Sequence, residues 1–361
     1  LLVLLSLGTV SAGSFNIDEV LATKLSACKA APTGTPLKIG YAADFSDLGG
    51  FADKPASQAA LYFVELVNCA GGVDGSPIKL IIKNIEGNPE VTQRVGHELM
   101  AAGVSAMLGP PFPDFGEPLL QVTAGKVATL FVASTEPMLA NSKALSYLVA
   151  FDDTAQATAA AKFALQQGWR TAVTFSAPGP YFGYNPKIFS KVFKAGGGSI
   201  TADYNFVPID DMDFSTQANK MASAGKAPDV VYSAMLSFQS AVLRGQLDAA
   251  GVKTNYLVTD AFEATGGYFT KGVEGFYHTT HSYPAEGSRV KILADGYQAA
   301  KGAPLENASF GGLAVDALAV IISAFQSSGS MDPKILGAAI ANADGVEGAT
   351  SNLSYSGANG A

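Results

Sequence analysis

The sequence predicts an α/β fold built from two doubly wound, three-layer α/β/α domains. Short apolar segments of strand length alternate with longer segments whose apolar residues recur at helical spacing. Glycine-rich turns separate the two kinds of segment. The alternation occurs twice along 361 residues, a length that suits two domains of roughly 150 residues each.

The first unit opens with a strand expected at 37–41. Ala60, Val64 and Val67 follow at i, i+4 and i+7, which is typical of a helix that packs one apolar face on a sheet. The run GGVDG at 71–75 ends this helix, because glycine adopts the positive φ that a helix stop requires. The remaining expected elements of the unit are a strand at 78–82, a helix carrying Val91, Val95 and Leu99, and strands at 104–108 and 128–132.

The second unit repeats this order without a residue-level repeat. Its expected elements are a helix at 154–166, a strand at 171–175, a helix at 184–195, a strand at 199–206, a helix at 214–224, a strand at 229–233, a helix at 236–250 and strands at 256–259 and 272–279. Two long helices, at 289–301 and 309–327, remain after the second unit is complete. The economical arrangement returns them to the first domain, which leaves a cleft between the domains where small ligands bind.

Composition excludes several function classes. Hydrophobic residues make up 48% of the chain and charged residues 15%, which indicates a well-packed globule and not a disordered chain. The net charge of -8 would repel nucleic acid and anionic membranes, and the chain contains no basic cluster. We therefore expect neither as a partner.

The N-terminal segment 1–12 is interpreted as the remnant of a signal peptide. It is mostly apolar, and Val10-Ser11-Ala12 supplies small residues where a signal peptidase cleaves. A buried N-terminal strand or helix is the alternative. Segment 13–36 would then form an N-terminal arm. Cys28 and Cys69 suit an exported protein with one disulfide tying this arm to the first long helix, although two free buried thiols stay open as an alternative.

The chain lacks the common catalytic motifs. It contains no phosphate-binding Gly-Lys-Ser/Thr loop, no nucleophile elbow and no dinucleotide-binding glycine motif. His278 and His281 are three residues apart without a nearby thiolate or carboxylate partner in the sequence, so a surface or hinge role is favoured over a metal site. We therefore expect a protein that is not an enzyme and that uses no cofactor and no metal.

Three stretches of the chain carry a resemblance to a known family. They are LKIGYAADFSDLGGFADKPASQAALYFVELVNCAGGVDG, FVASTEPML and DFSTQANKMASAGKAPDVVYSAMLSFQSAVLRGQLDAAGVKTNYLVTDAF. These stretches resemble the periplasmic solute-binding proteins of ATP-driven (ABC) importers, in the branched-chain amino acid (Leu/Ile/Val-binding) group with the type I periplasmic-binding fold. The resemblance runs from about Leu37 to the end of the sequence.

The resemblance implies two lobes joined by a hinge of three crossovers, near Ala150, Ser282 and Glu347. The expected N-terminal lobe comprises 37–149 plus 283–346, and the expected C-terminal lobe comprises 150–282 plus 347–361. The family pattern continues for two more strands after Tyr355, so the C-terminus is interpreted as truncated.

The resemblance also implies ligand-binding residues. Ser134 and Thr135 follow the strand at 128–132, where relatives contact the ligand's carboxylate and ammonium. Helix capping is the alternative, since Ser-Thr-Glu-Pro also resembles a helix start. Asp260 follows the strand at 256–259 and matches an acidic residue that pairs with the ligand's ammonium in relatives. A helix cap or a loop carboxylate in water is the alternative for Asp260.

Aromatic residues complete the expected pocket. Tyr181 lies in an expected loop and matches a tyrosine that closes over the ligand from the second domain. Phe51 and Phe310 match aromatic or hydrophobic pocket positions, with core packing as the alternative. Ala133 and Met235 lie in the resembling stretches and are also counted as ligand-binding candidates.

One stretch departs from the family. Pro110-Pro111-Phe112-Pro113-Asp114-Phe115 stands where relatives carry small residues that hold a carboxylate. The prolines remove three backbone donors, Asp114 would repel an anion, and the two phenylalanines would narrow the pocket. The ligand is therefore expected to be amino acid-like, or larger, more apolar or cationic, for instance an aromatic compound or an amide.

Two functions follow from the resemblance. In the first, the chain is a periplasmic or extracellular monomer that captures a small organic ligand and delivers it to the membrane permease of an ABC importer. In the second, the same fold is the ligand-binding part of a sensory receptor.

Overall fold

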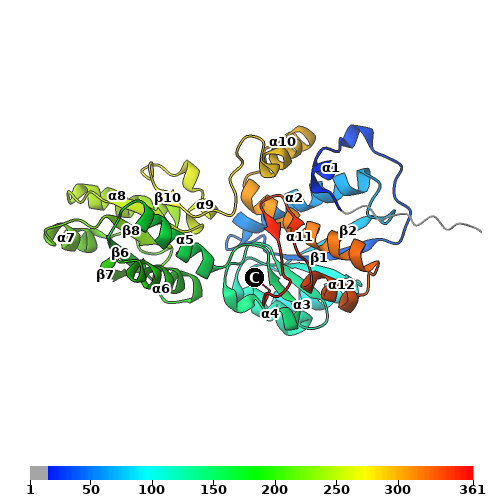
Figure 1. The fold of residues 1–361 in the computed structure, drawn as a ribbon, viewed down its shortest axis with the longest axis horizontal. Coiled ribbons are helices and arrows are strands. Elements are labelled where there is room, and N and C mark those ends of the chain that lie inside the picture. Colours follow the sequence, from blue (N-terminus) through cyan, green and yellow to red (C-terminus); the bar gives the residue numbers. More distant parts are fainter. Residues whose placement is uncertain (1–14, 361) are drawn as a thin grey trace, which may run out of the picture.

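The computed structural model describes residues 15–360, and the expected signal peptide remnant at 1–12 lies outside this range. Two lobes lie side by side, each built on its own parallel sheet of five strands (Figure 1). The predicted fold class, two α/β domains with helices on both faces of each sheet, is confirmed.

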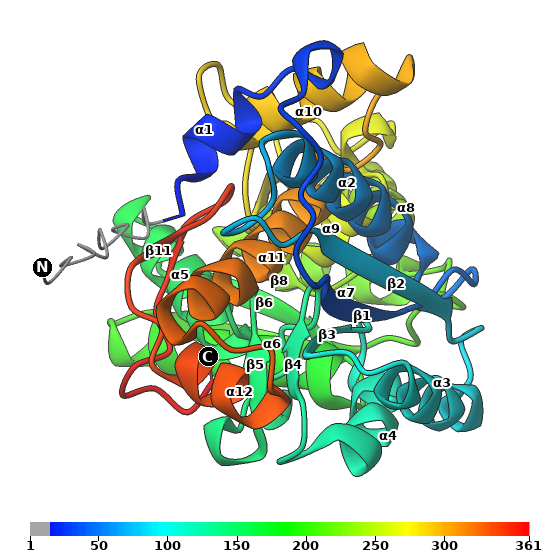
Figure 2. The same ribbon diagram turned by 90° about the vertical axis from the view of Figure 1, so that its right-hand side faces the viewer.

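The first lobe is built on a sheet of order β2-β1-β3-β4-β5. Its strands are β1 (Leu37–Ala43), β2 (Ile78–Asn84), β3 (Ala106–Gly109), β4 (Ala128–Phe131) and β5 (Ser146–Leu148). Its helices are α1 (Ile17–Leu21), α2 (Gly50–Cys69), α3 (Pro89–Ala101), α4 (Pro113–Thr123), α10 (Arg289–Lys301), α11 (Ala308–Ser328) and α12 (Pro333–Ala341). Helices α2, α11 and α12 cover one face of the sheet, and α3 and α4 cover the other (Figure 2).

Helix α11 forms the centre of the first lobe. It is the one helix in the described part of the chain that is long and apolar enough to cross a membrane. Most of its residues are buried, because it lies in the main hydrophobic core beside α2. The helix therefore stabilises the lobe as a core helix, and α10 packs against both α11 and α2.

The second lobe is built on a sheet of order β10-β9-β8-β6-β7. Its strands are β6 (Thr171–Ser176), β7 (Ser199–Asn205), β8 (Val230–Ser233), β9 (Asn255–Val258) and β10 (Tyr277–His278). Its helices are α5 (Asp153–Gln166), α6 (Pro180–Ala195), α7 (Ser215–Ser223), α8 (Ser237–Ala249) and α9 (Ala261–Ala264). Helices α5 and α6 cover one face, and α7 and α8 the other.

Proline-rich segments form two helix starts that were not predicted from the sequence. Helix α4 begins at Pro113, and α6 begins at Pro180 instead of Tyr184. Proline suits the first helical turn, because its fixed φ is helical and the missing N–H has no intrahelical acceptor there. The late strand expected at 272–279 is shortened to β10, and β5 and α12 were not expected.

The C-terminal segment corrects the expected lobe boundaries. A hairpin of β11 (Val346–Glu347) and β12 (Asn352–Leu353) packs on α11, and Leu353 and Tyr355 belong to the core of the first lobe. The Tyr355 hydroxyl donates to the Leu148 carbonyl at 2.7 Å, and the Leu148 N–H donates to the Gly360 carbonyl at 2.7 Å. Assigning 347–361 to the second lobe was therefore wrong for the described residues up to 360, because their apolar side chains are buried against the first lobe.

The N-terminal arm is tied to the first lobe. Cys28 and Cys69 form the predicted disulfide, which joins the arm to the end of α2 across a sequence separation of 41 residues. Nearby, Asp18 on α1 accepts from Arg289 on α10 at 2.7 Å, and Glu347 accepts from the same guanidinium. The arm therefore docks on elements distant from it in the sequence.

Candidate functional site

A cleft of about 820 Å³ lies between the two lobes. Its walls come from segments that follow the carboxyl ends of strands in both sheets, the usual position for a ligand in an α/β fold. Seven of the nine candidate ligand residues line it: Phe51, Asp114, Ala133, Thr135, Tyr181, Asp260 and Phe310. The fold thus brings residues that are more than 200 positions apart in the sequence, such as Phe51 and Phe310, to one site.

Two candidates do not line this cleft. Ser134 is fully buried and its hydroxyl donates to the Pro110 carbonyl at 3.1 Å. Alternate residues of an extended segment point to opposite sides, so Ala133 and Thr135 face the cleft and Ser134 faces the protein. Met235 is buried in the core of the second lobe, and its neighbour Leu236 lines the cleft instead.

Asp260 lies at the centre of a hydrogen-bonded network. Its side chain makes no helix-capping hydrogen bond, and the residue is only 7% exposed. The Tyr181 hydroxyl donates to Asp260 Oδ1 at 2.5 Å, and His281 Nε2 lies 3.1 Å from Oδ2. Neither the helix cap nor the water-exposed loop carboxylate describes Asp260.

The partners of Asp260 keep it ionised. Burial raises the pKa of this carboxyl, but the hydrogen bond and charge of His281, together with the Tyr181 hydroxyl, outweigh burial and hold the pKa below its ordinary value. Burial and the Asp260 charge raise the pKa of Tyr181 well above 10.0. A neutral tyrosine and a negative aspartate are therefore presented to the cleft.

The first turn of α6 positions Tyr181. Gly179 has a φ of 116°, a conformation that only glycine adopts readily, and it turns the chain from β6 into α6. The Ala261 N–H donates to the Tyr181 hydroxyl oxygen at 3.1 Å, so the ring is held by both the start of α9 and Asp260. Tyr181 is thus a first-turn helix residue and not the loop residue expected.

Two further carboxyl groups, Glu136 and Asp153, lie near Asp260 and were not predicted from the sequence. Glu136 lines the cleft and is 4% exposed, and its Oε2 has no hydrogen-bond partner among the described residues. Asp153, at the start of α5, is fully buried and accepts at Oδ1 from Gln156 at 2.8 Å and Asn185 at 3.0 Å. Its Oδ2 likewise has no partner in the described part of the chain.

Burial changes the protonation of this pair. Burial, followed by the charge of Asp153, raises the pKa of Glu136 to about 8. Burial also raises the pKa of Asp153 to about 6, against the lowering effect of Asn185.

The only sequence signal for Glu136 was its place after a strand end, which the Ser-Thr-Glu-Pro helix-start pattern obscured. The following 3-10 helix, Pro137–Leu139, makes no side-chain capping bond.

Two chain crossings between the lobes, among the described residues, meet beside this network. Phe151, in the first crossing, stacks on His281, in the second, with ring centroids 4.1 Å apart. The Asp153 N–H donates to the Thr135 carbonyl at 2.8 Å, which joins α5 of the second lobe to the cleft wall of the first. Cleft residues and crossing segments therefore share direct contacts.

The cleft also has aromatic and acidic walls. Phe51 lies 6.0 Å from both Phe112 and Phe310 between ring centroids. The acidic side chains among the described lining residues are Asp47, Asp114, Glu136 and Asp260, and no lysine, arginine or histidine is among them. The cleft thus combines apolar aromatic walls with negative charge.

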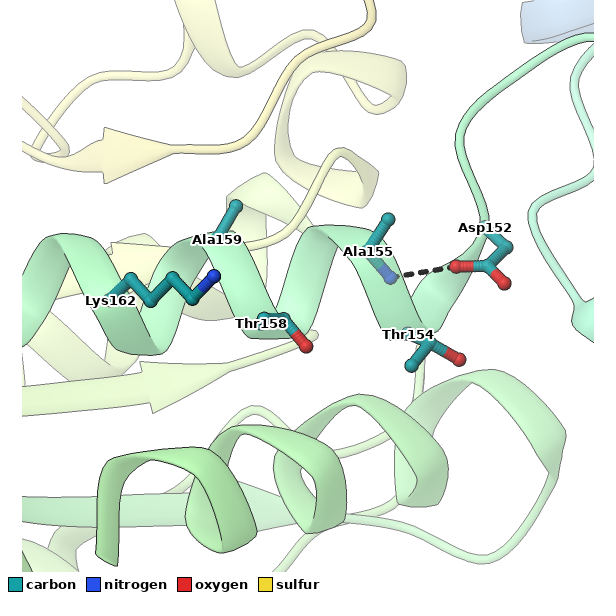
Figure 3. A pocket seen from close by; sticks show the side chains of 6 residues that line it. All are labelled: Asp152, Thr154, Ala155, Thr158, Ala159 and Lys162. Carbon is teal, nitrogen blue, oxygen red and sulfur yellow. Dashed lines mark hydrogen bonds between the residues drawn. The ribbon is translucent and has the colours of Figure 1, made fainter. Parts of the chain in front are cut away.

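A second hollow, of about 410 Å³, lies over α5 (Figure 3). Its six lining residues all come from α5 and its N-cap, so it has a single wall. The Asp152 carboxylate accepts from the Ala155 N–H at 2.7 Å and thereby caps the helix. Within residues 15–360 no group of three or more His, Cys, Asp and Glu side chains is placed to hold a metal.

Comparisons with known proteins extend these observations. A curated relative, Leu/Ile/Val-binding protein homolog 3 of Brucella melitensis, is 25% identical over 302 residues, which are 81% of this chain and 80% of the relative. The solved structure of LivJ from Streptococcus pneumoniae in complex with isoleucine has a TM-score of 0.74 at 19% identity and covers 89% of this chain and 92% of LivJ.

A solute-binding protein from R. palustris in complex with benzoate has a TM-score of 0.68 at 17% identity and covers 86% of each chain. The structural neighbours share the two-lobed type I fold. The sequence model of the periplasmic binding protein family matches residues 36–361, and we conclude that this chain belongs to that family.

Proposed function

We propose that this protein is an extracytoplasmic solute-binding protein that captures a small organic ligand between two hinged lobes and delivers it to an ABC importer. The observation that carries the proposal is the cleft, whose walls come from both lobes. A ligand that touches Thr135 on one side and Asp260 on the other makes both sets of contacts only when the lobes are close. Such a ligand would shift the population toward a closed form that a permease can recognise.

Exposed apolar side chains at the cleft support closure. Leu48 of the first lobe is 53% exposed, and Ile209 of the second is 60% exposed, and both line the cleft. Exposed apolar residues on both lobes of a cleft favour closure, because closure removes their surface from water. The ligand would complete this contact and bring the lobes together.

A ligand screen tests the proposal. We expect differential scanning fluorimetry over amino acids, amides, amines and aromatic acids to identify a ligand that raises the unfolding temperature. A ligand at a hundred times its dissociation constant should add about 2.7 kcal/mol of stability. Small-angle X-ray scattering should then show a smaller radius of gyration with ligand than without it.

Transport itself is measured in cells. Deletion of the gene should reduce uptake of the identified ligand, and a plasmid copy should restore it, whereas an Asp260→Asn copy should not. Absence of any hit in the screen would reject the proposal. A ligand that binds without any change in uptake would favour a sensory role.

A further inference from the structure

The cleft contains a buried carboxyl group, Glu136, whose Oε2 has no hydrogen-bond partner among the described residues. We propose that Glu136, with Asp153 and Asp260 beside it, binds the cationic group of the ligand, and that the ligand is an organic amine without a free carboxylate. This inference rests on the proposed solute-binding function and names its ligand class.

Glu136 is placed as a ligand contact. It is 4% exposed, lines the cleft, and has Oε2 without a hydrogen-bond partner among the described residues. A buried carboxyl oxygen without a hydrogen-bond partner costs free energy. A bound ammonium group removes that cost, because it supplies a hydrogen-bond donor and a positive charge. Asp153 is fully buried and does not line the cleft, and it acts on Glu136 through its negative charge.

The charged groups around Glu136 leave negative charge in excess. Asp153 on α5 and Asp260 before α9 both act on Glu136, and the charge of Asp260 also acts on Glu263 on α9. His281, from the second crossing, is the one basic side chain that pairs with these carboxyls among the described residues, and its Nε2 already contacts Asp260. Tyr181 and Tyr232 stay neutral, because burial and these carboxylates raise the pKa of each hydroxyl well above 10.0.

The cleft also disfavours a ligand carboxylate. Four residues on the described lining carry carboxyl side chains, and none carries a basic side chain. Four lining residues are prolines, which offer no N–H to an anion: Pro111, Pro113, Pro178 and Pro180. The faces of Phe51, Phe112 and Phe310, in contrast, suit the apolar body of an amine and attract its charge.

Matched ligands that differ only in their charged groups test the inference by calorimetry on the full chain. The aliphatic set is 3-methylbutylamine, leucine and 4-methylpentanoate, and the aromatic set is 2-phenylethylamine, phenylalanine and 3-phenylpropanoate. We expect at least one amine to bind about tenfold or more tightly than its amino acid, and neither acid to bind detectably.

Proton release gives a second readout. Burial keeps Glu136 protonated near neutral pH, and an arriving cation favours its ionised form. Amine binding at pH 7 should therefore release protons, measured as a dependence of the binding enthalpy on the ionisation enthalpy of the buffer. Glu136→Gln should weaken amine binding about tenfold or more and reduce this release. Glu117→Gln, an exposed change of the same kind on α4, should leave both unchanged.

Each outcome separates the inference from the function it rests on. Tighter binding of an amino acid or an acid than of the amines overturns the inference and supports solute binding. Wild-type amine affinity in a folded Glu136→Gln protein also overturns it. Failure of all six compounds, with no other hit in the ligand screen, counts against both proposals.

Discussion

Asp260 shows how one carboxylate is kept charged inside a protein. It is 7% exposed, yet Tyr181 donates to one of its oxygens and His281 contacts the other. Burial alone would favour the neutral acid, whereas these two partners favour the ionised form. The residue therefore presents a preorganised negative charge to the cleft, whose alignment requires no rearrangement when a cation arrives.

We predict that Asp260→Asn weakens binding of the natural ligand about tenfold or more. The amide keeps the shape of the carboxyl but removes its charge, and a charged hydrogen bond contributes about 1.5–3 kcal/mol. Isothermal titration measures the affinity. Asp295→Asn, an exposed position on α10 paired with Lys291, makes the same change in net charge and should bind as wild type does. Unchanged affinity in Asp260→Asn would remove this residue from the ligand site.

At the scale of the element, the end of β3 leads directly into the proline-rich cleft wall. Gly109 pairs with Phe131 of β4, and a Cβ added at Gly109 would stand 2.5 Å from Cδ1 of that ring. Phe131 is fully buried, so the ring has little freedom to move. The absence of a side chain at Gly109 lets the strand lie against this ring.

Gly109→Ala is therefore expected to destabilise the first lobe by about 1–3 kcal/mol, the usual cost of overpacking a core. Urea unfolding followed by circular dichroism measures the difference. Gly245→Ala is the matched control, because α8 leaves nothing within 4 Å of the added methyl group. That change should be neutral or stabilise by about 0.5–1 kcal/mol, since alanine favours a helix interior. Equal effects of the two substitutions would contradict the steric argument.

At the scale of the whole molecule, two separately packed lobes meet over an acidic cleft. The family consists of ligand-binding proteins, which agrees with the prediction that the chain is not an enzyme. Several buried carboxyls accompany this architecture. Burial raises the pKa of Asp53 and Glu136 to about 8 and that of Asp153 and Asp316 to about 6. Stability therefore depends on pH in a defined direction.

We predict that the protein loses stability as the pH rises from about 5 to about 8.5. Each of these carboxyls has a higher pKa in the folded protein than in the unfolded chain. Its contribution to the free energy of unfolding is therefore complete below the unfolded pKa, and it is lost as the pH rises through the folded pKa. The pKa of Asp260 is instead lowered in the folded protein, so the stability that Asp260 contributes is lost in acid, below about pH 4. The unfolding temperature should thus be highest in mildly acidic buffer.

The Glu136→Gln variant isolates the contribution of Glu136 to the pH dependence of stability. The amide does not ionise, so the variant should lose less stability than wild type between about pH 6 and pH 8.5. Glu117→Gln should keep the wild-type profile, because that residue is exposed. An unfolding temperature that rises steadily up to pH 8.5 in wild type would show that these carboxyls are already ionised in the folded protein.

The sequence by itself determined the fold class and the order of the main elements. The spacing of Ala60, Val64 and Val67 and the alternation at 78–82 are local patterns, and burial of an apolar face follows directly from them. Glycine runs marked the helix ends for the same local reason. The disulfide and the family could also be predicted from the sequence, because each prediction depends on residue types within short stretches.

Only the tertiary structure decided which side chains meet. Glu136, Asp153 and Asp260 are far apart in the sequence, and no local pattern says that their carboxyls lie near one another or that the described cleft lining holds no basic side chain. The strand-end geometry turned Ser134 away from the cleft and Thr135 toward it. Docking of Tyr355 on Leu148 likewise placed the C-terminal segment on the first lobe. These outcomes depend on contacts between distant residues, which hydrophobic burial selects only once the whole chain is packed.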